Sequence, residues 1–272
     1  MPSVTYTPVP DNVGQEPLHS FDSAWLKIHW ANQHVSKLKT LCNIFIQHHA
    51  YSVQMNHDPE RDEYRFTVLP TQPIPVDIPL SLGDAIHNMR AALDYCWMGL
   101  YRAAKPGVTT KYTFPMAERR KDLEETLRKA PIETAFKGTN DLILNRVKPY
   151  KEGNFLLWAL NKLDVRDKHN LLIPSLAVTL IKNVTITGDN VGGIHFANCN
   201  IQANKPFGLA RFTGGGFANL KFEHEPETTV EIVFGKGQFV DDQPLLETVG
   251  TMLKLSAEVV QLFRKTFLVE PS

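Results

Sequence analysis

Cysteine is scarce in this chain, and an excess of either charge is absent. The three cysteines, Cys42, Cys96 and Cys199, are too few and too scattered for a disulfide framework or a paired-cysteine zinc site. Reduced thiols and a cytoplasmic location are therefore expected. The 29 basic residues balance the 29 acidic ones. This balance argues against a dedicated nucleic-acid binder, whose surface usually carries a strong positive field.

Long apolar runs are missing as well. The start Met1-Pro2-Ser3-Val4 has neither the basic region nor the apolar core of a signal peptide, and no uncharged stretch is long enough to cross a bilayer. Internal repeats and low-complexity tracts are also absent from the sequence. We therefore expect a cytosolic protein without a membrane partner. The 272 residues, 43% of them hydrophobic, suffice for a sizeable core.

The first two thirds of the chain have mainly helical patterns. Residues 1–19 contain several prolines and are expected to form an extended arm. From about residue 20 to 48, apolar residues recur at spacings of three and four, which predicts an amphipathic helix. Alternating residues around a polar turn predict a β-hairpin over residues 51–68. Further helices, each bounded by Pro, Gly or a polar cap, are expected at roughly 81–103, 117–129, 132–147 and 154–171.

After Pro174 the apolar pattern changes to alternation, which continues to about residue 236 and predicts antiparallel strands. A final helix is expected to begin near Pro244. Strands grouped after helices favour an α+β fold over a parallel, doubly wound sheet. The last helix can close the β region or return to pack on the helices. The predicted parts are the arm (1–19), a mainly helical region with a small hairpin (20–173), and an antiparallel β region with a C-terminal helix (174–272).

One predicted helix contains polar residues beside core residues, in the run His87-Asn88-Met89-Arg90-Ala91-Ala92-Leu93-Asp94-Tyr95. At about 100° of rotation per residue, His87, Arg90 and Asp94 lie in a narrow arc next to the apolar face. Arg90 and Asp94 have the spacing of an intrahelical ion pair. The simpler interpretation is a salt bridge with a bystander histidine. The other is a functional site, because burying such groups is costly unless they pair or take part in chemistry.

Asp84 precedes this run and has two interpretations. Ser81-Leu82-Gly83-Asp84 fits a capping box in which Ser81 caps the helix. Asp84 and His87 also have the carboxylate-x-x-histidine spacing of di-metal helical bundles, but the other strong helices supply no second pair of this kind. We therefore favour the cap, and we predict neither a metal site nor a cofactor.

A second polar run, Leu160 to His169, is also expected to be helical. Its residues Asn161, Asp164 and Lys168 line up on one face at i, i+3 and i+7, and Asp167 borders them. These residues can form a solvated face with an Asp164–Lys168 ion pair. Alternatively they face Arg90 and Asp94 across two packed helices and form one polar network. A buried network of this kind is tolerated only when its members are fully paired, and it then fixes the relative position of the helices.

The two runs, with Val147-Lys148-Pro149-Tyr150 between them, resemble a widespread group of bacterial proteins with no established activity. Members of that group typically read H-N-L-R-S-A-L-D-H and L-N-x-x-D-K-H-R at these places, and the similarity covers roughly residues 20–175. The R-x4-H part of their first motif is similar to the R-x4–6-H signature of HEPN-type helical ribonucleases, in which arginine and histidine cleave RNA without metal. The resemblance thus implies a HEPN-like helical region.

Two of this chain's departures from that pattern affect the chemistry. Tyr95 stands where the group usually has histidine, and Asn170 stands where it usually has arginine. Tyrosine, with a reference pKa of about 10, is poorly suited to proton transfer at neutral pH. If the resemblance implies catalysis, His87 or His169 has to supply the general acid and base.

Two functions from different classes follow. The favoured one is a non-catalytic binding or interaction module, in which the polar network joins two helices and the β region binds a partner. The alternative is a HEPN-like, metal-independent ribonuclease of a toxin or defence type, with Arg90 stabilising phosphate charge and His87 or His169 transferring protons. RNA would contact residues 119–151, which contain nine basic and five acidic residues. The oligomeric state stays open, with a homodimer as one option.

Overall fold

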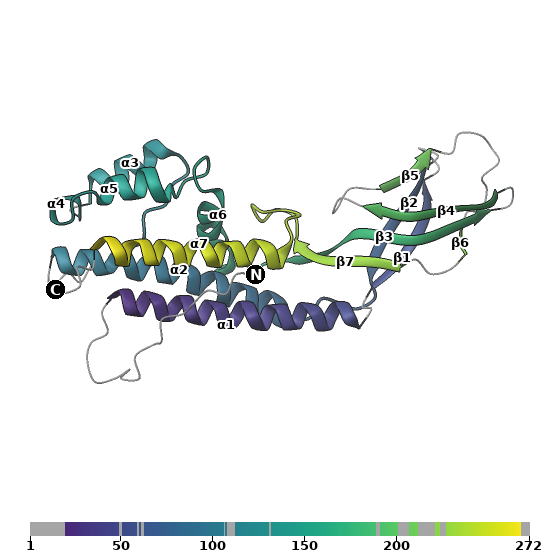
Figure 1. Cartoon of the computed structure of the whole chain (residues 1–272), viewed down its shortest axis with the longest axis horizontal. Coiled ribbons are helices and arrows are strands. Elements are labelled where there is room, and N and C mark those ends of the chain that lie inside the picture. The colour runs from purple at the N-terminus through teal and green to yellow at the C-terminus, as the bar shows by residue number, and fades with distance from the viewer. Residues whose placement is uncertain are drawn as a thin grey trace. The chain divides into compact units, whose positions relative to one another are not determined.

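The fold combines seven α-helices, a π-helix and antiparallel strands among the residues described by this computed structural model (Figure 1). The described residues are 20–48, 51–58, 60, 63–105, 107, 112–130, 132–188, 191–200, 207–211, 221–223 and 227–267. Most of these residues are helical, and the strands among them pair antiparallel. The predicted combination of helices with antiparallel strands is therefore confirmed. The arm predicted over residues 1–19 lies outside the described residues.

Backbone contacts group the chain into two compact units, which are described separately below. Of the described residues, those within 20–37, 81–171 and 247–267 belong to the helical unit, and those within 38–80 and 172–246 belong to the β unit. The domain boundaries expected from the sequence stay predictions.

The helical unit is built on four helices whose bounds are α1 (Ser20–Gln47), α2 (Asp77–Ala104), α6 (Phe155–Asp167) and α7 (Leu245–Phe267). The apolar face of α2 is buried at the spacing that the sequence predicted, and includes Ile86, Met89, Leu93, Cys96 and Trp97. The ring of Phe263 in α7 lies 5.8 Å from that of Phe114, which in turn lies 6.0 Å from Trp97 in α2. From Glu247 on, the C-terminal helix therefore belongs with the helices, the second of the two placements that its sequence allowed.

Helix α2 begins at Asp77, earlier than predicted, and the capping box at Ser81 is wrong. Pro79 falls in the first turn, where backbone N–H groups have no intrahelical acceptor, so it does not interrupt the helix. Ser81 is consequently a buried residue inside α2. The Asp84 carboxylate lies 3.5 Å from Nδ1 of His34 in α1 instead of folding back on a cap.

The predicted helix over 132–147 is divided into α4 (Ile132–Ala135), α5 (Thr139–Asp141) and a π-helix, η1 (Leu142–Val147). Gly138 separates α4 from α5 with a φ of 88°, a left-handed conformation that suits glycine. The Glu133 carboxylate accepts hydrogen bonds from the amides of Gly138 and Asn140 across this break. Before it, α3 (Arg120–Arg128) corresponds to the helix predicted over 117–129.

The β unit contains two sheets. The predicted hairpin is present as β1 (Tyr51–Asp58) and β2 (Glu63–Pro70), and β5 (Phe207–Arg211) extends it on the β2 side. The second sheet centres on β3 (Pro174–Gly188), which pairs with β4 (Val191–Asn200), β6 (Lys221–Phe222) and β7 (Glu227–Phe234). The hairpin is therefore part of a larger sheet that uses a strand from the C-terminal half.

A buried glutamine secures the end of β7. The Gln238 side chain accepts a hydrogen bond from the Ile173 amide and donates to the carbonyls of Ile173 and Gly235. A side chain on Gly235 would meet the Ile173 carbonyl at 2.7 Å, so only glycine permits this close approach. The turn after β7 is thereby fixed to the start of β3.

Burial makes Cys42 and Cys96 poor nucleophiles. Cys42 and Cys96 are free and buried. Desolvation raises the pKa of the Cys42 thiol to about 12 and raises the pKa of Cys96 as well. Among the helices that the structure describes, none is long and apolar enough to cross a membrane.

Candidate functional site

Arg90 lies at the centre of a buried polar network that joins α2 to two other segments. Its Nε donates a hydrogen bond of 2.9 Å to Oδ1 of Asn161 in α6, and its Nη2 donates one of 3.1 Å to the Phe114 carbonyl. Its Nη1 donates to Oδ1 of Asp94, one turn later in α2. Because Arg90 is only 6% exposed, these acceptors replace the water that its charge would otherwise require.

Asp94 completes the network on the side of the Phe114 segment. Its Oδ1 also accepts a hydrogen bond of 2.7 Å from the Phe114 amide. Burial raises the pKa of Asp94, although the adjacent Arg90 charge and the Phe114 amide both act to lower it. The Arg90–Asp94 pair therefore fixes both backbone polar groups of Phe114, whose ring is in the core.

The sequence predicted that the helix of Arg90 packs against the helix of Asp164, and the hydrogen bond from Arg90 to Asn161 confirms it. The local sequence explains how α6 presents these groups. Asn154 caps α6 by accepting from the Leu157 amide, and Leu157, Leu160 and Leu163 bury its apolar face. Asn161 and Asp164 flank that face, which places their side chains toward α2.

Asp164 forms a second cluster beside Arg90. Its carboxylate is almost fully buried, with Oδ1 3.0 Å from Nδ1 of His87 and Oδ2 2.6 Å from Nζ of Lys168. The side chains of His87 and Lys168 are 55% and 53% exposed. An imidazole held through Nδ1 by a carboxylate, with its ring open to solvent, has the geometry of an acid–base pair.

Two further residues of the polar runs have structural contacts. The buried Asn88 donates from Nδ2 to the Asp84 carbonyl and accepts from Lys27 of α1 at 3.0 Å. The Asp167 carboxylate lies against the backbone of α2 at Gly83, where an added Cβ would be 2.4 Å from Oδ2. Asp167 thus contacts α2 one turn before His87, whereas the side-chain nitrogens of Arg90 donate to Asn161, Asp94 and Phe114.

The remaining predicted catalytic residue, His169, is not brought to Arg90. It follows the last turn of α6, where its amide donates to the Arg166 carbonyl. Its exposed side chain forms no hydrogen bond or ion pair within the described part of the chain. Tyr95 is 42% exposed and lies outside the Arg90 network as well.

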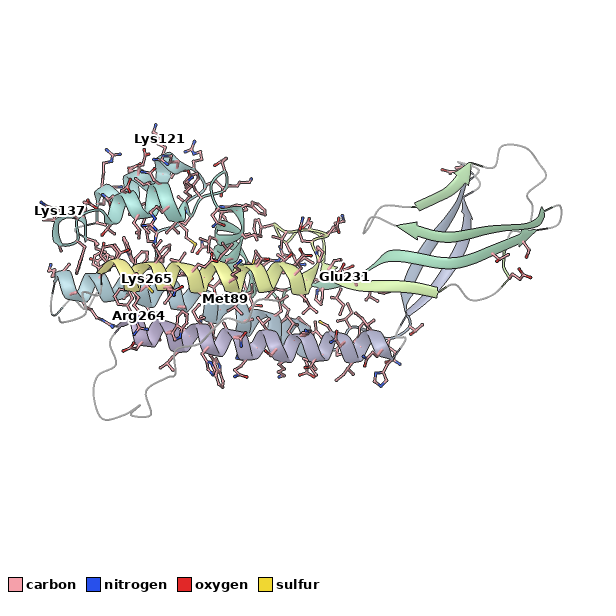
Figure 2. All side chains as sticks on the ribbon, viewed as in Figure 1. Met89, Lys121, Lys137, Glu231, Arg264 and Lys265 are labelled. Atoms are coloured by element: carbon pink, nitrogen blue, oxygen red, sulfur yellow. The ribbon has the colours of Figure 1, made fainter. Side chains whose placement is uncertain are left out.

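Many charges in the predicted RNA contact, residues 119–151, are engaged with neighbouring acids. The ion pairs are Arg119–Asp122, Arg120–Glu124, Lys129–Glu125 and Lys151–Glu118. Lys121 and Lys137 are exposed on this segment (Figure 2). The segment therefore has a mixed surface, in which acidic side chains lie beside several of the basic ones.

Phe114 is the member of the network that the sequence could not reveal. It contributes a backbone amide and a carbonyl, which every residue has, so no residue type signals its role. The close contact at Gly83 could have been suspected from the sequence, because glycine inside a helix costs stability and is retained where space is needed.

Metal ligands do not gather anywhere in the described ranges, where no group of three or more His, Cys, Asp or Glu side chains could hold an ion. Comparison of the chain with family models, curated proteins and solved structures finds no match. The case for a function therefore depends on the residues and contacts of this chain.

Proposed function

We propose that this protein is a non-catalytic interaction module, related to the bacterial group that its two motifs resemble. In this proposal the motif residues lock a HEPN-like set of helices, and the β unit supplies the surface for a partner. The observation that carries the proposal is the burial of Arg90 and the set of hydrogen bonds that its guanidinium donates. Its Nε, Nη1 and Nη2 all donate to internal acceptors, and 6% of the residue is exposed.

An arginine that stabilises a phosphate has to offer N–H groups to that phosphate. Arg90 directs its three nitrogens to Asn161, Asp94 and Phe114 instead. A phosphate could replace these acceptors only by leaving the carboxylate of Asp94 without its cation. The same motif places Asn88 against Lys27 and Asp84, which is also a structural role.

The test is an RNA cleavage assay on the full-length protein, with a labelled mixed-sequence RNA at neutral pH, with and without EDTA. The proposal predicts that the RNA stays intact in both conditions. Cleavage that persists in EDTA and co-purifies with the protein through two orthogonal columns would contradict it.

A second candidate function, a metal-independent ribonuclease of the HEPN type, is favoured by one observation: the His87–Asp164 pair. Here His87 transfers the proton, Asp164 orients its ring and Arg90 acts as a positioning residue. Under this alternative, His87→Gln lowers the cleavage rate by about 10²–10⁴-fold without changing the melting temperature by more than about 2 °C. His48→Gln is the matched control, since His48 is an exposed histidine whose Nδ1 lies 2.7 Å from the Ile44 carbonyl oxygen, at the end of α1.

The partner, the location and the assembly are part of the same proposal. The chain as a whole has equal numbers of basic and acidic residues, and several basic side chains of residues 119–151 form ion pairs with acidic ones. Both features favour a protein partner over RNA. A cytoplasmic location agrees with reduced, buried thiols. A homodimer stays an option that sedimentation of the purified protein decides.

A further inference from the structure

One exposed histidine of the helical unit is held by a buried carboxylate. The side chain of His87, on α2, is 55% exposed, and its Nδ1 lies 3.0 Å from Oδ1 of Asp164 on α6. Only 4% of the Asp164 side chain is exposed, and its Oδ2 accepts a hydrogen bond of 2.6 Å from Nζ of Lys168. The imidazole is thus fixed at one nitrogen, while more than half of its surface stays open to solvent.

This contact determines which nitrogen of His87 can act as a nucleophile. A carboxylate oxygen accepts hydrogen bonds, so Nδ1 is the donor and carries the proton of the neutral ring. Nε2 then keeps its lone pair. Positive charge develops on the ring when Nε2 forms a bond, and the Asp164 carboxylate stabilises that charge, as in other nucleophiles that a neighbouring group orients.

His34 and His48 do not combine these properties. Nδ1 of His34 also lies near a carboxylate, that of Asp84 at 3.5 Å, but only 18% of the His34 side chain is exposed. His48 is exposed, but its Nδ1 lies 2.7 Å from the Ile44 carbonyl oxygen, which carries no net charge. Both histidines therefore serve as internal references for the reactivity of His87.

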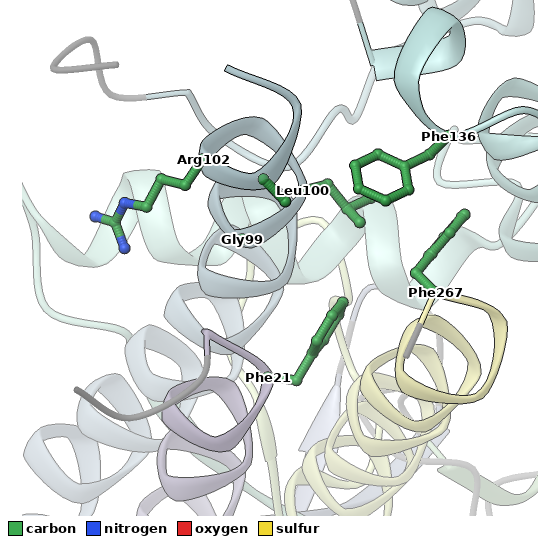
Figure 3. A pocket seen from close by; sticks show the side chains of 7 residues that line it. Phe21, Gly99, Leu100, Arg102, Phe136 and Phe267 are labelled. Carbon is green, nitrogen blue, oxygen red and sulfur yellow. The ribbon is translucent and has the colours of Figure 1, made fainter. Parts of the chain in front are cut away.

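The surroundings of His87 suit a group that a partner delivers, not a substrate held in a pocket. The pocket in Figure 3, with a volume of about 360 Å³, is lined by apolar residues and Arg102, and His87 is not among its residues. The exposed ammonium of Lys168 shares the carboxylate of Asp164 with His87. An ammonium has three N–H donors, so it can bind a carboxylate and a phosphate oxygen at once.

We propose that His87 is a phosphorylation site, at which Nε2 accepts a phosphoryl group from an activated donor, a phosphoramidate or an acyl phosphate. Nε2 attacks the phosphorus and the N–P bond forms. The bond between phosphorus and the leaving group breaks, and its electron pair goes to the leaving group. The Nδ1 proton stays on the ring, where Asp164 balances the positive charge, and Lys168 pairs with the phosphoryl oxygens. The proposal depends neither on Arg90 nor on RNA cleavage.

The test is incubation of the full-length protein at neutral pH with potassium phosphoramidate and, separately, with acetyl phosphate. Peptide mass spectrometry at alkaline pH, where phosphohistidine is stable, gives the labelling rate of each histidine. We expect at least one donor to label His87 about 10–100-fold faster than His48, because a hydrogen bond to a charged group stabilises the developing charge by a corresponding amount. Phosphorus NMR should place the group on Nε2. Denaturing urea should remove the difference in rate, since the difference depends on the folded contact.

Asp164 is a positioning residue in this reaction, and Asp164→Asn tests that role. An asparagine amide can either donate to Nδ1 or accept from it, so the ring is no longer held in one tautomer. We expect the labelling of His87 to slow by about ten-fold and to appear on both ring nitrogens. Asp84→Asn is the matched control, because Asp84 lies one turn before His87 on α2 but its carboxylate contacts His34. It should change the rate at His87 by less than about two-fold.

Circular dichroism establishes that each variant is folded. The proposal is overturned if neither donor labels His87 faster than His48 in the folded wild type, if the label lies on Nδ1, or if Asp164→Asn is labelled like wild type. The assay contains no RNA, so its outcome is separate from that of the cleavage test.

Discussion

Arg90→Ala is expected to lower the free energy of unfolding by about 3–5 kcal/mol. The variant would leave the partly buried Asp94 carboxylate without its cation and the Phe114 carbonyl without its donor. In a chain of this size, a loss of this magnitude lowers the melting temperature by roughly 6–20 °C. Thermal unfolding followed by circular dichroism measures it.

Arg119→Ala is the matched control for this loss. Arg119 forms a two-bond ion pair with Asp122, but it does so at the surface, with 69% of its side chain exposed. Exposed pairs contribute about 0–1 kcal/mol. If the two arginine variants have the same stability, the Arg90 network does not hold the helices together.

Gly83→Ala is expected to destabilise the protein, although alanine favours helices over glycine by about 1 kcal/mol. Gly83 is buried in α2, and an added Cβ would be 2.4 Å from Oδ2 and 2.7 Å from Cγ of Asp167. To relieve the overlap, the Asp167 side chain has to turn away from α2 and give up its present position, or α6 has to shift. Overpacking of this kind costs about 1–3 kcal/mol.

The sign of this effect should reverse when the obstacle is removed. In an Asp167→Ala background, Gly83→Ala no longer meets the carboxylate, so we expect a gain of about 0.5–1 kcal/mol from helix propensity alone. Chemical denaturation of the four proteins in this cycle measures both differences. A gain from Gly83→Ala that is the same with and without Asp167 would show that the contact does not constrain α2 and α6.

The packing of α2 on α6 could be predicted from the sequence, because it depends only on two general properties of helices. Apolar residues at helical spacing define the faces, and polar residues beside them need partners. Arg90 and Asp94, four apart on one helix, had an obvious pairing, and Asn161 was one of three polar residues that could face them.

Features that depend on tertiary contacts could not be predicted from the sequence. The start of α2 at Asp77 depends on a first turn that tolerates Pro79, which local propensity alone misjudges. The role of Phe114 rests on backbone atoms, and the break at Gly138 depends on Glu133 bonding to amides beyond it. Asp167 was expected near Arg90 but lies at Gly83, because its position on α6 directs it toward an earlier turn of α2.

The central claim is that Arg90 joins α2 to α6 through Asn161, and a double-mutant cycle tests it most directly. The free energies of unfolding of wild type, Arg90→Ala, Asn161→Ala and the double variant give the coupling between the two side chains. The contact of 2.9 Å within a buried network predicts a coupling of about 1–3 kcal/mol. Additive losses, with a coupling indistinguishable from zero, would contradict the structural role assigned to Arg90.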